Sequence, residues 1–292
     1  MFKKGLPASK LSLAISLATL LPSLSLYAQD TRTILTPGGQ PIFEIRFFDV
    51  GDGPFQTDED KPVLSTWNLD EQQKQKILQG VTYWANALTP APGQLPVVIN
   101  VGTYDEENAT GAGGRAPSED KVFITQVQAG LTNQTTDDLD NGSHGQFTMG
   151  KLQWDHVPYT PSQLPVTGNF DLAATTLHEL GHALGVLNTV TDKLGEKSNT
   201  PYYMPGISIW AAHLRDDNGN PARPDQVVLC SLCNNPYDPT GFDLRQNRGY
   251  FSGEHVSEVL DGAMPGLPIT ILGGDGSVVD DDYMSHIELK TA

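Results

Sequence analysis

The sequence is poor in cysteine, because its 292 residues include only Cys230 and Cys233, spaced as CSLC. Two cysteines supply half of the ligands that a four-thiolate zinc site needs, which excludes that class of site within this chain. A redox-active pair would stand between a strand and a helix, whereas NNPYDPTG, which follows this pair, is typical of turns. We therefore expect a short disulfide between the two cysteines in a loop.

Basic residues are also scarce, with 18 lysines and arginines against 35 acidic residues and a formal net charge of −17. A surface of this sign repels the phosphate backbone of nucleic acids and the anionic headgroups of membranes. We therefore expect no nucleic-acid partner and no binding to a membrane surface. The alternative interpretation is that the acidic surface only keeps the protein soluble.

A long apolar run occurs only near the amino terminus. There the basic MFKK precedes LSLAISLATLLPSLSL, which is too short and too often interrupted by serine and proline for a transmembrane helix. This pattern is typical of a secretory signal peptide over residues 1–28, with cleavage after Ala28. The expected mature chain, residues 29–292, is then secreted or displayed at the cell surface, with no membrane insertion of its own. Its oligomeric state is left open.

Strand and helix patterns alternate in the first part of the mature chain. FEIRFFDV, residues 43–50, has the alternation and the aromatic and β-branched residues of a strand. A helix capped by Asn68 or Asp70 follows, and LPVVINVGTYD, residues 95–105, has the continuous apolar centre of a strand buried on both faces. Strand, helix and strand in this order indicate a crossover unit and, with the later segments, an α+β fold.

The segments that follow are less regular. The glycine-rich stretch 107–120 is predicted to be a loop, and 121–130 and 146–154 are predicted strands. FDLAATTLHELGHALGV, residues 170–186, is a predicted helix, after which the pattern weakens into long loops. The loops rich in aspartate and asparagine would suit calcium, but none has the spacing of an EF-hand, so solvated loops are favoured.

The predicted helix carries the motif HELGH, in which His178 and His182 are four residues apart. About 400° of helical rotation separates them, so both imidazoles lie on one face and can bind one tetrahedral zinc ion. From Glu179 a carboxylate can take a proton from a water on zinc, whose pKa the metal lowers to roughly 7, and later deliver that proton to a leaving amine.

The alternative is a chance HExxH in an ordinary helix, because the motif fixes only three positions. Three features favour zinc instead: leucines that can pack against a sheet, export to a compartment that contains zinc, and two glycines. Gly181 costs a helix interior about 1 kcal/mol relative to alanine, which indicates close packing, and Gly185 can end the helix in a left-handed turn.

The stretch LHELGHALGV, together with FSGEHVSEVLDGAMPGLPI and SHIEL, resembles the metzincin zinc endopeptidases, in particular the leishmanolysin-like branch and related bacterial exported peptidases, some of them autotransporter passengers. The resemblance covers most of residues 43–290, and only the helix motif is highly specific. It implies a twisted mixed sheet with a backing helix in residues 29–166, and the active-site helix with a loop-rich part in residues 167–292. It also implies that a polypeptide substrate lies along an edge strand, for which 146–154 is the candidate.

The third metal ligand departs from the usual pattern of that family. A histidine or aspartate is usual three residues after the glycine, where this chain has Asn188, and an amide is not an ordinary zinc ligand. The family's methionine turn follows the third ligand, whereas Met284 precedes the last histidine here. The leishmanolysin-like branch presents its third histidine after a long insertion, and this resemblance implies that His286 in YMSHIELK completes the site with water.

The alternatives are that His286 lies on the surface near the terminus, or that Glu254 or Glu258 is the ligand. The other histidines suit surface, packing or substrate-side positions better: His144, His156, His213 and His255.

Two functions are consistent with these patterns. The first is an exported zinc-dependent endopeptidase that hydrolyses protein or peptide substrates, with Glu179 as the catalytic residue and His178, His182 and His286 as zinc ligands. The second is an adhesin-like binding module at the cell surface, built on the same scaffold, whose catalysis is weak or lost. The intact Glu179 favours the enzyme, because a binding module has no need of it.

Overall fold

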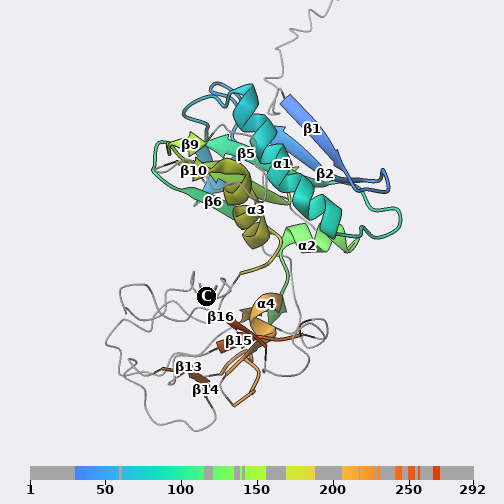
Figure 1. Ribbon diagram of the computed structural model, residues 1–292, viewed down its shortest axis with the longest axis vertical. Helices are drawn as coiled ribbons and strands as arrows, with labels where there is room; N and C mark the ends of the chain where they lie inside the picture. The colour runs from blue at the N-terminus through green and yellow to red at the C-terminus, as the bar shows by residue number, and fades with distance from the viewer. Residues whose placement is uncertain are drawn as a thin grey trace, which may run out of the picture.

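The protein is an α+β molecule built on one mixed sheet with few helices, as the computed structural model in Figure 1 shows. The expected signal peptide lies outside the residues that the structure describes. Within the described residues, no helix is both long and apolar enough to cross a membrane. The described residues are 30–58, 61–114, 121–134, 139, 142–155, 169–187, 206–216, 218–226, 228–230, 241–244, 249–253, 256 and 266–269.

Five strands form the main sheet, in the order β1-β2-β5-β8-β6. The three inner strands run parallel to one another, and the two outer strands, β1 and β6, are antiparallel to their neighbours. Among the described strands, β1 and β6 are therefore the two edges of this sheet. The strand bounds are β1 Asp30–Leu35, β2 Pro41–Phe47, β5 Val97–Thr103, β6 Ala109–Gly113 and β8 Gly145–Met149.

The predicted crossover unit is confirmed. Helix α1, Glu71–Ala87, connects β2 to the parallel strand β5, which is buried along almost its whole length. Asp70 rather than Asn68 is the N-cap, and it forms a capping box with Gln73, in which each side chain accepts from the other residue's backbone N–H. The sequence pattern thus fixes both the start of the helix and its connection in the sheet.

The prediction that residues 146–154 form the edge strand is wrong. Strand β8 lies inside the sheet, between β5 and β6. The edge strand next to β8 is β6, in the stretch 107–120 for which the glycine content predicts a loop. The sequence of β6, ATGAG, has little intrinsic preference for a strand, since glycine and alanine are depleted there. Its small residues instead allow a helix to approach its backbone closely.

The predicted strand over 121–130 is also wrong. Only a two-residue strand, β7 at Val122–Phe123, forms there, and helix α2 follows at Gln126–Leu131. Thr125 caps this helix and forms a capping box with Gln128. Thr125 and Gln128, three residues apart, are therefore a sequence signal for the start of α2, although the apolar alternation of this segment favours a strand.

The core fills the space between the sheet and two helices, α1 and α3, the latter spanning Leu172–Ala183. The two helices cross closely at Gly80 of α1, where an added Cβ would lie 2.6 Å from the Ala173 carbonyl oxygen. The indole N–H of Trp84 also donates to the Leu177 carbonyl at 2.8 Å. Residues buried to 1 % exposure or less include Phe43, Ile45, Ile77, Val97, Ile99, Leu172 and Leu180.

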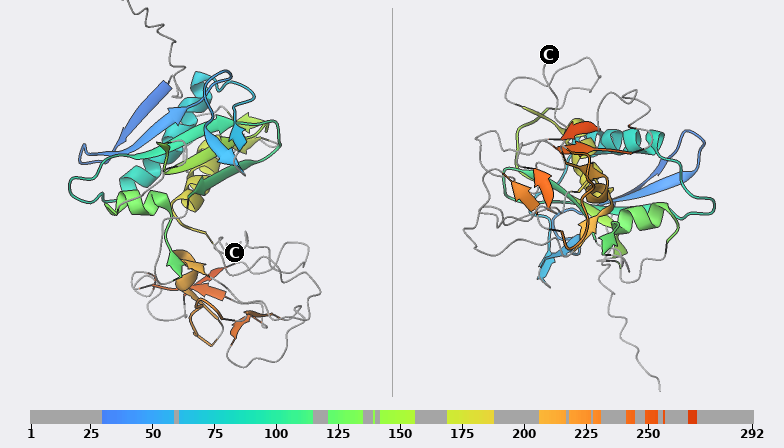
Figure 2. Two further views of the ribbon diagram at one scale, coloured as in Figure 1. Left: turned by 180° about the vertical axis from the view of Figure 1, so that it is seen from behind. Right: turned by 90° about the horizontal axis from the view of Figure 1, so that it is seen from below.

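The short elements after α3 gather beyond its carboxyl end, on the side away from the main sheet (Figures 1 and 2). Strand β11 pairs in parallel with β7, which links this part to the chain before α2. Three strands form a second small sheet in the order β12-β15-β16. The remaining bounds are β3 Gln56–Asp58, β4 Lys61–Val63, β9 Trp154–Asp155, β10 Phe170–Asp171, β11 Ile207–Ser208, α4 Ile209–Ala212, β12 Leu214–Arg215, β13 Val228–Cys230, β14 Phe242–Leu244, β15 Gly249–Phe251 and β16 Leu267–Ile269.

Candidate metal centre and general base

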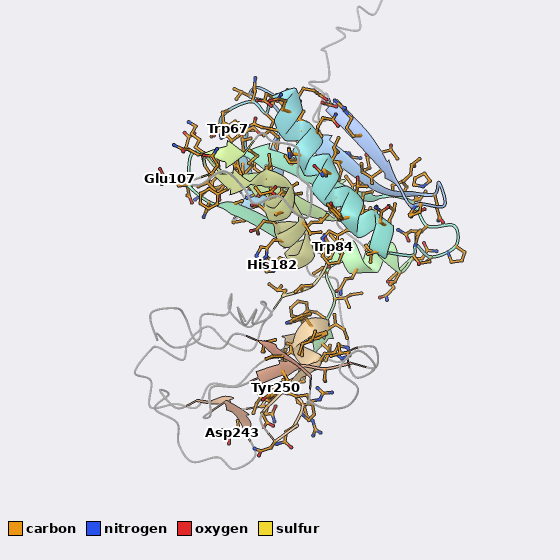
Figure 3. All side chains as sticks on the ribbon, viewed as in Figure 1. Trp67, Trp84, Glu107, His182, Asp243 and Tyr250 are labelled. Atoms are coloured by element: carbon orange, nitrogen blue, oxygen red, sulfur yellow. The ribbon has the colours of Figure 1, made fainter. Side chains whose placement is uncertain are left out.

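Helix α3 holds the HELGH motif, and capping fixes where it begins. The Asp171 carboxylate accepts from the backbone N–H groups of Ala173 and Ala174 at 2.9 and 3.1 Å. A carboxylate at this position satisfies two of the otherwise unpaired N–H groups of the first turn and is favoured by the helix dipole. The buried side of the helix packs against the sheet and α1, while His178 is exposed and His182 half-buried on another face. Figure 3 shows His182 near the carboxyl end of α3, with Trp84 of α1 on the neighbouring helix.

The two histidines of the motif are brought together. Their Nε2 atoms lie 3.2 Å apart, and their rings are nearly perpendicular, at 88°, with centroids separated by 4.8 Å. Zinc binds imidazole nitrogen at about 2.0–2.1 Å, so two such nitrogens on a tetrahedral ion are separated by roughly 3.3 Å. The separation of the His178 and His182 nitrogens therefore fits one shared metal ion.

The end of α3 selects the tautomer of His182. Gly185 has φ +98°, and its N–H bonds the His182 carbonyl while the Val186 N–H bonds the Gly181 carbonyl, both at 2.9 Å. This is a Schellman turn, as the glycine predicted, and it presents the Val186 carbonyl to the His182 ring. His182 Nδ1 lies 2.7 Å from that oxygen, which requires the proton on Nδ1 and leaves the Nε2 lone pair for a metal.

Glu179 extends from the same helix to the edge of the sheet. Its Oε2 accepts from the backbone N–H of Gly111 in β6 at 3.0 Å. The side chain is half-buried, so its carboxylate is held by the strand and still borders solvent. Sequence reasoning found Glu179 but missed Gly111, which lies in the stretch predicted to be a loop.

The helix and the edge strand are in direct backbone contact. A Cβ added to Gly111 would lie 2.0 Å from the Glu179 carbonyl oxygen, and one added to Gly113 would lie 2.6 Å from the Ala183 carbonyl oxygen. Neither distance leaves room for a side chain. The two glycines of β6 therefore set how closely the sheet edge approaches the motif.

Tyr104 belongs to the surroundings of Glu179. Burial raises the pKa of the Tyr104 phenol, and the negative charges of Glu106 and Glu179 add to this effect. Each of the raising causes disfavours the phenolate. Tyr104 therefore contributes a neutral phenol to this end of the sheet.

The predicted third ligand and its alternatives lie outside the described residues, as do Asn188, Met284 and Cys233. Among the residues that are described, no group of three or more histidines, cysteines, aspartates and glutamates comes together to hold a metal. The structure thus brings the two predicted histidine ligands together, while the carboxylate of the predicted base is bonded to β6. The predicted residues outside the description are His286, Glu254, Glu258, His156 and His255.

The two remaining described histidines have structural surroundings. His144 Nδ1 accepts from the Val98 N–H at 3.1 Å, and burial, followed by the charge of Arg46, lowers the pKa of its imidazole. This histidine therefore secures a strand start rather than facing a substrate. His213 caps α4, is exposed, and has its ring 5.7 Å from that of Phe251.

The aspartate-rich loop after β12 has its described carboxylate engaged by amide groups. Asp216 is fully buried, and its Oδ1 accepts from the N–H groups of Asn218 and Asn220 at 2.9 and 2.8 Å. Its Oδ2 accepts from the Asn220 side-chain amide at 3.0 Å and from the Asp243 N–H at 3.3 Å. These donors give Asp216 a structural role in shaping the loop and attaching it to β14.

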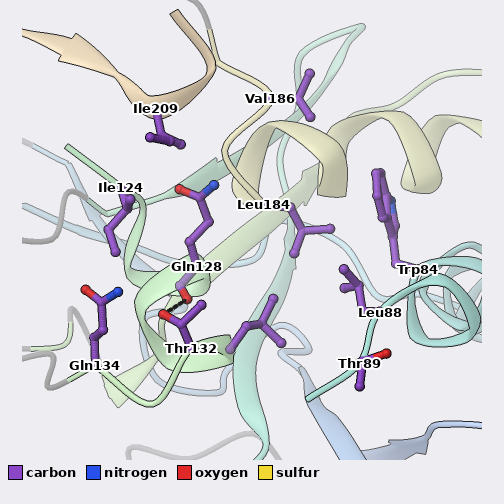
Figure 4. A pocket seen from close by; sticks show the side chains of 11 residues that line it. Trp84, Leu88, Thr89, Ile124, Gln128, Thr132, Gln134, Leu184, Val186 and Ile209 are labelled. Atoms are coloured by element: carbon purple, nitrogen blue, oxygen red, sulfur yellow. Dashed lines mark hydrogen bonds between the residues drawn. The ribbon is translucent and has the colours of Figure 1, made fainter. Parts of the chain in front are cut away.

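An apolar pocket of about 440 Å³ lies behind the carboxyl end of α3, between α1, α2 and α4 (Figure 4). Val186 connects it to the histidine pair, because its side chain lines the pocket while its carbonyl holds His182. Among the described residues, none with a charged side chain lines the pocket. The lining residues are Trp84, Leu88, Thr89, Ile124, Gln128, Leu131, Thr132, Gln134, Leu184, Val186 and Ile209.

No protein-family model matches this chain, and no curated protein and no solved structure matches it. Function must therefore be argued from the geometry of α3 and β6 and from the sequence motif.

Proposed function

We propose that the protein is an exported zinc-dependent endopeptidase on a metzincin-like scaffold. The observation that supports this most directly is the pair of Nε2 atoms 3.2 Å apart on the helix that also carries Glu179 to the sheet edge. Two histidines that can bind a metal are, by themselves, compatible with many functions. A carboxylate one residue from the first ligand, facing the edge where an extended chain can pair, is the arrangement that peptide hydrolysis needs.

The chemistry divides between the metal and the chain. When bound to His178, His182 and a third ligand, zinc would polarise the scissile carbonyl and acidify the attacking water. Glu179 accepts a proton from that water, whose oxygen bonds to the carbonyl carbon. The same carboxyl group then delivers the proton to the amide nitrogen, so that the C–N bond breaks and a free carboxylate and amine leave.

The substrate in this proposal is an extended polypeptide that pairs with the outer edge of β6. Backbone pairing with a free strand edge supplies affinity without demanding a particular side chain. A peptide at this edge runs past the Glu179 carboxylate, which is already bonded to the strand through Gly111. Strand β6 thus replaces the segment 146–154 as the proposed substrate strand.

The third zinc ligand stays a proposal, and we assign it to His286. Replacing His286 by alanine should lower zinc affinity steeply, whereas Asn188→Ala should leave it nearly unchanged. Zinc affinity measured by competition with a chromogenic chelator decides between the two residues. The reverse ranking would assign the ligand to Asn188 and refute His286.

The activity test uses the full mature chain, residues 29–292, loaded with zinc. Turnover of casein or gelatin that disappears with a chelator and returns with zinc supports the endopeptidase. The matched control is Glu179→Gln, which should retain the metal. A zinc-loaded chain that binds a protein ligand without cleaving casein or gelatin would favour the adhesin-like module instead.

A further inference from the structure

The outer edge of β6 presents a defined set of backbone groups. Asn108 accepts from the Gly150 N–H at 2.8 Å, and the ladder continues with Thr110 opposite Thr148 and Ala112 opposite Gln146. Hydrogen-bonded and non-bonded pairs alternate in an antiparallel ladder. The N–H and C=O groups of the three intervening residues therefore point away from β8, at Ala109, Gly111 and Gly113.

One of these outward groups is bonded to the helix. The Gly111 N–H donates to Glu179 Oε2 at 3.0 Å, although the two residues are 68 positions apart in the chain. The contact depends on glycine, because a Cβ at position 111 would lie 2.0 Å from the Glu179 carbonyl oxygen. The strand thus contacts Glu179 twice, at the backbone through its Cα and at the carboxylate through its N–H.

We propose that the Gly111 N–H is the positioning group for the Glu179 carboxylate. A glutamate side chain has three rotatable bonds, and a half-buried one on a helix face adopts several orientations. A charge-assisted hydrogen bond from a donor fixed in a sheet selects one of them. Oε2 then stays on the strand, and Oε1 is the oxygen that exchanges the proton. The assignment of that exchange rests on the proposed peptidase function, whereas the contact itself does not.

The first experiment measures the contact without activity. Amide hydrogen exchange by NMR should show the Gly111 N–H protected in the full mature chain, although this N–H points away from β8. Glu179→Ala should accelerate exchange at Gly111 by about tenfold or more relative to Ala112, whose N–H belongs to the ladder. Glu179→Gln retains an acceptor and should keep part of the protection. An unchanged ratio of Gly111 to Ala112 in Glu179→Ala would overturn the proposal.

The second experiment removes only the donor. Replacing Gly111 by glycolic acid, introduced by semisynthesis, converts its N–H into an ester oxygen and adds no Cβ. If the N–H orients the base, kcat should fall on the order of 10²-fold while KM and zinc affinity stay within about twofold. An unchanged kcat refutes the positioning role.

The two results separate this inference from the function on which it rests. If the zinc-loaded parent chain cleaves no peptide, the endopeptidase proposal fails, and the exchange ratio alone decides whether Gly111 holds Glu179. If the parent chain is active and the ester variant is equally active, the function stands and the positioning role fails.

Discussion

Glu179 and the two histidines differ in which parts of the chain position them. His178 and His182 need only one helical turn to face each other, and the Schellman turn after them fixes the His182 ring. Glu179 needs a strand from elsewhere in the sequence. At the scale of single residues, the proposed metal binding and the proposed catalysis therefore depend on separate contacts.

Glu179→Gln should keep zinc and lose turnover, because an amide occupies the same volume and cannot accept the proton. General acid–base catalysis contributes about 10²–10⁴ in rate, which sets the expected loss of kcat. Zinc content after desalting, measured beside the parent chain, is the control. A loss smaller than about tenfold in a zinc-loaded variant would contradict the role of general base.

His144 should make stability depend on pH near neutrality. Because burial lowers its pKa in the folded chain, the unfolded chain takes up the proton first as the pH falls, and the free energy of unfolding decreases. The decrease should begin near pH 6.5, the ordinary value for histidine, and end at the lower folded pKa.

The measurement for His144 is urea unfolding of the parent chain and of His144→Gln between pH 7.5 and 5.5. The parent should lose more stability over this window than the variant does, since the glutamine does not titrate. Equal losses would assign the pH dependence to other groups. His213→Gln is the control, because His213 is exposed.

At the scale of elements, Gly80 of α1 and Gly181 of α3 should respond oppositely to replacement by alanine. Gly80→Ala places a Cβ 2.6 Å from the Ala173 carbonyl oxygen, so α1 and α3 must separate, at a cost of about 1–3 kcal/mol in unfolding free energy. Gly181→Ala meets only Trp84, at an ordinary 3.4 Å, and should gain up to about 1 kcal/mol from helix propensity.

Denaturant unfolding of both variants checks this pair of predictions. Similar destabilisation by the two changes would contradict the helix crossing described here. The geometry also corrects a prediction from the sequence, which assigns the close packing to Gly181. The tight contacts of α3 lie instead at Gly80, Gly111 and Gly113, on the neighbouring elements.

The elements that the sequence predicts correctly are those whose type and ends depend on their own residues. The apolar spacing of α1, its cap at one of two predicted residues, the buried strand β5 and the glycine that ends α3 are local signals, and each is found in the structure. Helical spacing also places the rings of His178 and His182 together, whereas the roles of these residues and of Glu179 stay predictions.

The elements that were missed depend on distant contacts. Strand β6 has no side-chain signal for a strand, since its glycines are required by the backbone of α3 rather than by the sheet. Because the glycines of this stretch predict a loop, the sequence makes β8 the apparent edge of the sheet. It gives no signal that Gly111 contacts Glu179. Helix α2 differs from β6, because its own sequence contains a helix signal, the capping box of Thr125 and Gln128. The apolar alternation of the same segment favours a strand instead.

At the scale of the whole molecule, zinc should stabilise the fold by mass action. A metal that binds only the folded chain adds about 4 kcal/mol to the free energy of unfolding at a free concentration 1,000 times its Kd. Thermal unfolding should therefore shift upward with zinc and downward with a chelator. In His178→Ala and His182→Ala the shift should disappear. Its persistence in both variants would place the stabilising metal elsewhere.

Gly111 and Glu179 are 68 positions apart, so their contact forms later than the helical turn that carries the histidines. A helical turn forms within microseconds, whereas a contact over this sequence distance must await closure of a long loop. During refolding, a newly formed α3 already offers two nitrogens to a metal, while its carboxylate has no strand to hold it. In the proposed peptidase, hydrolysis would therefore begin only after β6 and α3 have packed together, which would spare unfolded copies of the same protein from cleavage by half-formed neighbours.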